Sequence, residues 1–115
     1  MTKPADIDPD TQHALNIFVT RAKREYDMVG AILFGSRARQ DFRPDSDADL
    51  AVLLQGRRHR FLDINLALAD IAYDVLLETG ILIHPLPVWE DEWQHPERYT
   101  APALLRNISR EGVPI

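Results

Sequence analysis

Residues 34–50 read FGSRARQDFRPDSDADL, and this stretch decides the fold of the chain. It begins with Gly35-Ser36 and, after ten further residues, reaches Asp47-Ala48-Asp49. An apolar run with β-branched and aromatic residues precedes it at 28–34, and its short length favours a buried strand over a helix. A second strand is predicted from Asp47 to Leu54. The stretch is therefore expected to be a turn between two strands, with Ser36 capping one helical turn.

The two acids of this stretch are candidate metal ligands. On a strand, residues i and i+2 point to the same face, so Asp47 and Asp49 should project together while Ala48 and Leu50 face the helices. Adjacent carboxylates repel each other unless a cation joins them. Mg²⁺ typically takes one or two protein carboxylates together with substrate phosphates. The pattern predicts a magnesium site at Asp47 and Asp49, the alternative being a solvated strand edge.

Gly35-Ser36 is a candidate phosphate site. A glycine at a strand end lets a phosphate approach the backbone, and a serine that opens a helical turn offers its hydroxyl and free N–H groups. Arg37 and Arg39 follow, and their guanidinium groups match phosphate oxygens. The alternatives are a simple strand-end turn for the Gly-Ser pair and solvated side chains for the two arginines.

The rest of the chain predicts an α/β (α+β) domain with a small mixed sheet of three or more strands flanked by helices. One helix is expected from a cap at Asp10 or Thr11 to about Tyr26, and another from Phe61 to Thr79, ended by Gly80. The third strand, 81–88, contains two prolines and is expected to be an edge strand or a partly paired one. A last helix is predicted over 102–110. The apolar face predicted for the helix over 61–79 comprises Leu62, Leu66, Ala69, Tyr73 and Leu76/Leu77.

Composition excludes several classes of protein. The chain has 115 residues, of which 45% are hydrophobic and 27% charged, so a single globular domain over 1–115 is expected. The net charge of −5 gives no basic footprint for duplex nucleic acid. The chain has no cysteine, which excludes disulfides and thiolate metal sites. No apolar run is long enough for a membrane span and no signal-peptide pattern is present, so a cytoplasmic protein is expected.

The segment GSRARQDFRPDSDADLAVLL, residues 35–54, resembles the signature of the DNA polymerase β nucleotidyltransferase superfamily. The small size resembles its minimal nucleotidyltransferase branch. The resemblance implies that Gly35 and Ser36 hold the triphosphate of ATP and that Asp47 and Asp49 bind Mg²⁺.

The third strand departs from the family pattern. Members that transfer nucleotides usually carry a third carboxylate there, whereas this strand reads ILIHPLPV over 81–88. By alternation His84 shares a face with Leu82 and Leu86, so it is expected near the metal site as a substitute base or ligand. The alternative is a structural histidine.

The resemblance implies transfer of AMP from ATP to a hydroxyl group. Members of the minimal branch often act with a HEPN-domain protein in prokaryotic toxin–antitoxin pairs, so a hydroxyl-bearing side chain of such a partner is the expected acceptor. One alternative is a non-catalytic antitoxin that masks its partner by contact. The other is a nucleotidyltransferase of the aminoglycoside type that acts as a homo-oligomer, with the pocket shared in a dimer.

Overall fold

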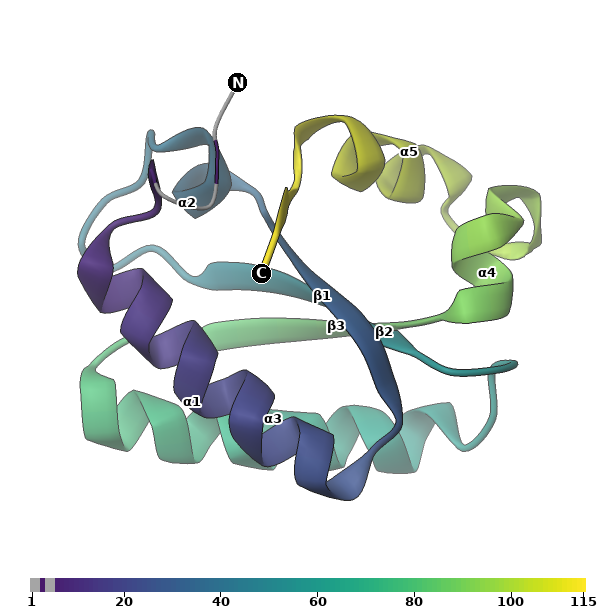
Figure 1. Ribbon diagram of the computed structural model, residues 1–115, viewed down its shortest axis with the longest axis horizontal. Coiled ribbons are helices and arrows are strands. Elements are labelled where there is room, and N and C mark those ends of the chain that lie inside the picture. Colours follow the sequence, from purple (N-terminus) through teal and green to yellow (C-terminus); the bar gives the residue numbers. More distant parts are fainter. Residues whose placement is uncertain (1–2, 4–5) are drawn as a thin grey trace.

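A four-stranded mixed sheet with helices on both faces forms the fold in the computed structural model, which describes residue 3 and residues 6–115 (Figure 1). The strand order is β3-β2-β1-β4. Strand β1 runs antiparallel to β2 and β4, and β2 runs parallel to β3. The predicted fold class is confirmed. The strands are β1 (Met28–Phe34), β2 (Ala48–Leu54), β3 (Ile83–Trp89) and β4 (Val113–Pro114).

The helices divide between the two faces of this sheet. In Figure 1, α1 and α3 lie on one side of the strands and α4 and α5 on the other. The helical segments are α1 (Pro9–Glu25), α2 (Ser36–Arg39), α3 (Phe61–Thr79), α4 (Glu90–Gln94), the 3₁₀ turn η2 (Pro96–Arg98) and α5 (Pro102–Glu111). Across the described residues, none of these helices combines the length and apolar character needed to cross a bilayer.

The helix ends follow local signals, with one correction. Helix α3 ends where predicted, because Gly80 adopts φ 78° and its N–H bonds to the Leu76 carbonyl. Helix α1 is capped by Asp8 and not by Asp10 or Thr11 as expected. The Asp8 carboxylate accepts a bond from the backbone N–H of Thr11, and Pro9 then occupies the first helical position.

Strand β2 sends alternate side chains into two separate cores. Ala48, Leu50, Val52 and Leu54 pack with α1 and α3, as the alternation predicts. The intervening Ala51 and Leu53 pack against α5 on the other face. Asp49 has the same parity as Ala51 and therefore lies on the α5 side of the sheet.

The predicted apolar face of α3 is wrong. The side chains that pack on the sheet are Ile64, Leu68, Ala72 and Val75. Leu62, Leu66, Tyr73 and Leu77 of the predicted face are between 56% and 69% exposed. Apolar residues occupy both sides of this helix, so periodicity alone does not decide which side faces the core.

The edge position predicted for β3 from its prolines is confirmed. The backbone N–H of Ala48 donates to the Leu82 carbonyl. In this segment the backbone N–H and C=O groups of the even-numbered residues therefore point toward β2, and those of the odd-numbered residues point away from it. Pro85 and Pro87 therefore occupy outward positions, where their missing N–H groups cost no ladder hydrogen bond.

The two faces of α3 lead to a matched prediction. Leu68→Ala should lower the free energy of unfolding by about 2–5 kcal/mol, because it opens a cavity in the core. Leu66→Ala, half a turn away on the same helix, should change it by no more than about 0.5 kcal/mol. Urea denaturation of both variants measures the difference. Equal losses would mean that α3 packs on the sheet through both faces.

Candidate active site

Asp49 lies at the centre of the candidate site. It pairs with Phe34 of β1 on one side and His84 of β3 on the other, and its Oδ1 is 3.4 Å from Nδ1 of His84. Partial burial raises the pKa of Asp49 above its ordinary value, and the neighbouring charge of Asp47 adds to this rise. His84 and Arg39 lower the pKa but do not cancel the effect. Negative charge is therefore costly at this position, and a cation would relieve that cost.

Gly35 brings the first turn of α2 against this carboxylate. Its φ of 74° is a conformation that other residues rarely adopt. A Cβ on Gly35 would also overlap Oδ2 of Asp49. Glycine is thus required here both by backbone conformation and by the closeness of the acid.

Ser36 is the first residue of α2, and Gly35 takes the capping position that the sequence assigns to the serine. The expected cap is therefore wrong. The Ser36 hydroxyl takes part in no hydrogen bond within the described residues. It stands half-buried beside Gly35, available to another ligand.

Asp47 is exposed and directly precedes β2, which begins one residue later than predicted. It lines an open cavity of about 240 Å³ together with His84 and with Ala69 and Ala72 of α3. Asp47, Asp49 and His84 thus gather near one end of β2 and β3. The structure brings the three predicted catalytic residues into one neighbourhood.

The donor set fits Mg²⁺ with a nucleotide better than a metal held by protein alone. In the described part of the chain, no three His, Asp or Glu side chains converge on one point as a complete metal site. Asp47 and Asp49 supply two hard carboxylate oxygens, and Mg²⁺ commonly completes its coordination with phosphate and water. The two acids remain the predicted metal ligands.

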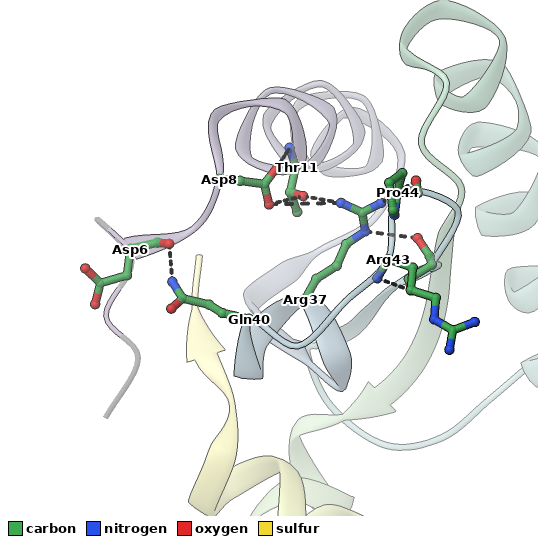
Figure 2. Close-up of polar contacts among 8 residues, drawn as sticks. Asp6, Asp8, Thr11, Arg37, Gln40, Arg43 and Pro44 are labelled. Atoms are coloured by element: carbon green, nitrogen blue, oxygen red, sulfur yellow. Dashed lines mark hydrogen bonds and ion pairs between the residues drawn. The ribbon is translucent and has the colours of Figure 1, made fainter.

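Arg37 has a different role from the predicted phosphate contact. Its side chain is only 3% exposed and lies among protein acceptors (Figure 2). Nη1 donates to Oγ1 of Thr11 at 2.7 Å, Nε to the Ser46 carbonyl at 3.0 Å and Nη2 to the Pro44 carbonyl at 3.2 Å. The guanidinium also lies 4.5 Å from the centre of the Phe42 ring. With its donors directed into the protein, Arg37 is not placed to hold a nucleotide.

These contacts make Arg37 a clamp on the loop that leads to Asp47. The Ser46 carbonyl, bound by Arg37, is the last backbone acceptor before that acid. The Asp8 carboxylate lies 4.0 Å from the guanidinium and adds a charge partner from the start of α1. The sequence did not predict the contact of Thr11 with Arg37, because a contact across 26 residues leaves no local pattern.

Arg39 is the arginine of α2 that remains accessible. It forms ion pairs with Asp41 at 3.3 Å and with Glu111 at 3.9 Å. Its charge also reaches Asp49, whose pKa it lowers. Because these ion pairs are exposed, breaking them to bind a phosphate would cost little free energy. Arg39 therefore remains a predicted nucleotide contact.

Comparison with known proteins shows which family the chain resembles. The family model described as "Polymerase beta, Nucleotidyltransferase" matches residues 18–84, which include every candidate site residue. The "Putative protein adenylyltransferase MJ1305" of Methanocaldococcus jannaschii is 34% identical over 76 residues, or 64% of this chain. The chain spans about half of that relative, 52% of its length. A crystal structure described as a "putative nucleotidyltransferase" from Sulfolobus solfataricus shares 16% identity with a TM-score of 0.49, over 81% of this chain and 82% of its own.

The clamp predicts a strong contrast between the two arginines of α2. Arg37→Ala should lower the free energy of unfolding by about 3 kcal/mol or more, because the buried Thr11 hydroxyl and two partly buried carbonyls lose their donor. Arg37→Lys should recover only part of the lost stability, since an ammonium group cannot reproduce the planar geometry of the three guanidinium hydrogen bonds. Arg39→Ala, the exposed control, should cost no more than about 0.5 kcal/mol. Chemical denaturation of the three variants tests the clamp, and a loss at Arg37 as small as at Arg39 would contradict it.

Proposed function

This chain belongs to the polymerase β nucleotidyltransferase family, and on that premise we propose that it transfers AMP from ATP to a hydroxyl group of a protein. The observation that carries the proposal is the packing of Gly35 against the Asp49 carboxylate, with Asp47 and His84 alongside. Phosphate-binding backbone and cation-binding acids are needed within a few ångströms of each other to hold a metal-bound triphosphate.

Each residue has a role in this proposal. Asp47 and Asp49 would hold Mg²⁺, which neutralises the charge that develops on the phosphates. The backbone and hydroxyl at Gly35-Ser36 lie along the triphosphate, and Arg39 pairs with a phosphate oxygen. The use of ATP fits a cytoplasmic location.

In the proposed reaction the acceptor oxygen attacks the α-phosphorus in line. The new phosphorus–oxygen bond forms as the bond to the β-phosphate oxygen breaks, and pyrophosphate leaves. His84 faces Asp49 with Nδ1, so Nε2 remains to take the proton of the acceptor hydroxyl. Histidine thereby fills the position at which the family usually carries a third carboxylate.

Two observations support a protein as the acceptor. The archaeal relative carries the description of a protein adenylyltransferase. The segment over 35–54 also resembles the minimal branch, whose members often act with HEPN-domain proteins. A HEPN-domain protein is therefore the proposed partner, and its modification would give the chain an antitoxin role.

One observation favours a second candidate function. Strand β3 contains no acid, whereas family members that transfer nucleotides usually carry a third carboxylate on this strand. A chain that has lost turnover would act as an antitoxin by contact alone and keep the nucleotide site as a remnant.

The acid pair gives the first test. Asp47→Asn combined with Asp49→Asn should abolish Mg²⁺-dependent ATP binding in calorimetric titration. The melting temperature should stay equal or rise, because the raised pKa of Asp49 means that its ionised form opposes folding at neutral pH. Asp45→Asn, in the exposed turn just before, is the matched control and should bind as the parent does. Unchanged binding by the double variant would remove the two acids from the metal site.

The second test distinguishes an enzyme from a protein that inhibits its partner by contact alone. A small amount of the chain is mixed with excess HEPN-domain protein, ATP and Mg²⁺, and the intact mass of the partner is then measured. An enzyme modifies many partner molecules per chain, and each gains the mass of AMP. Masking would be established instead if the partner stayed unmodified and its toxin activity were inhibited only by at least an equimolar amount of the chain. The Asp47/Asp49 double variant would then inhibit that activity equally well.

His84 is tested in the same assay. His84→Ala should reduce turnover by about 10²-fold, the usual scale for loss of a general base, while ATP binding is kept. His95→Ala, an exposed histidine outside the site, serves as the control. Transfer at the parent rate by His84→Ala would make this histidine structural.

A further inference from the structure

Helix α3 carries an apolar surface that no described part of the chain covers. Four of the seven large hydrophobic side chains that stand out as exposed belong to this one helix. We define the outer stripe of this helix as Leu62, Leu66, Ala69, Tyr73 and Leu77. At 3.6 residues per turn, these five side chains fall within about 80° of one another around the helix axis, and the stripe is about 22 Å long.

The outer stripe borders the candidate active site. Ala69 lines the open cavity that also contains Asp47 and His84. Leu82, 38% exposed, lines the same cavity and continues the apolar surface toward β3. A molecule bound along the stripe would therefore lie directly beside the groups proposed to act on the acceptor.

The charges that α3 itself places beside the stripe are of one sign. All four charged residues of α3 are acidic: Asp63, Asp70, Asp74 and Glu78. Glu78 pairs with Arg21 of α1, and Asp63 pairs with Arg60. Across the described residues, no ion pair engages Asp70 or Asp74. A second copy of this chain would bring acids against acids, whereas lysine or arginine beside an apolar surface would complement them.

The adjacent sheet edge disfavours a partner that adds a strand. Pro85 and Pro87 occupy outward positions on β3, so the free edge lacks two of the donors that strand addition requires. A helix laid along α3 requires no backbone donors and can cover an apolar stripe of this length. The surface therefore fits a helical partner.

We propose that the outer stripe docks an amphipathic helix of the acceptor protein, with an apolar face flanked by lysine or arginine. Docking would hold the acceptor hydroxyl beside Asp47 and His84. The identity of the docked protein as the acceptor rests on the proposed function, while the docking itself does not require catalysis.

The probe is a fluorescein-labelled 18-residue peptide with leucines at i, i+3, i+4 and i+7 spacing and lysines on both flanks. One control peptide keeps the leucines and replaces each lysine by glutamate, and another scrambles the lysine sequence. Anisotropy titration with the folded chain, without ATP, should show the first peptide binding at least tenfold more tightly than either control. Backbone amide resonances of α3 and of His84 should shift on binding.

Variants locate the binding. Leu66→Ser combined with Tyr73→Ser should weaken binding by tenfold or more without unfolding the chain, because both side chains are exposed. Val29→Ser removes a side chain that is 50% exposed on β1, outside the stripe, and should leave affinity unchanged. Asp70→Asn combined with Asp74→Asn should reduce the preference for lysine over glutamate peptides.

Several outcomes would overturn the proposal: no binding, equal binding of all three peptides, or binding that survives the Leu66/Tyr73 double variant. If the parent chain formed dimers through residues of the stripe, the occupant of the stripe would be a second copy of the chain. In the transfer assay the Leu66/Tyr73 double variant should raise KM for the partner and leave kcat unchanged. Peptide binding without any AMP transfer by the parent would refute the proposed function and leave the docking site standing.

Discussion

The buried guanidinium of Arg37 is the interaction on which the arrangement of the site depends. Taking a charge out of water is costly, and the cost is offset here by three hydrogen-bond acceptors, an aromatic ring and a nearby carboxylate. The segment over 41–47 contains no helix or strand of its own. Arg37 ties this segment to the start of α1, and the side chain of Gln40 adds a bond to the Asp6 carbonyl (Figure 2). The position of Asp47 follows from that anchorage.

The sheet then completes the site from three neighbouring strands. Gly35 follows β1, Asp49 lies near the start of β2, and His84 lies beside it on β3. The antiparallel pairing of β1 with β2 places the end of one strand at the start of the next, which lets Gly35 touch Asp49. The parallel pairing of β2 with β3 aligns His84 with the same acid. Mixed strand directions therefore bring residues far apart in sequence to one point.

Features set by local sequence could be predicted, and features set by tertiary contacts could not. The bounds of β1 and α3 and the edge position of β3 follow from an apolar run, a terminal glycine and two prolines. The buried face of α3 could not be predicted, because apolar residues on both sides of the helix give no unique stripe. Arg37 was expected on a phosphate, yet its acceptors come from residues 7 to 26 positions away. Its burial depends on how α1 packs against the loop, which no spacing within 34–50 reveals.

The most direct test of this account is paramagnetic relaxation by Mn²⁺, a substitute for Mg²⁺, in the presence of ATP. The account predicts selective broadening of the backbone amide resonances of Gly35, Ser36, Asp47, Asp49 and His84. Leu62, near the start of α3, should keep a sharp resonance. Broadening centred elsewhere on the chain, or uniform broadening without a centre, would contradict a metal–nucleotide site at the ends of these strands.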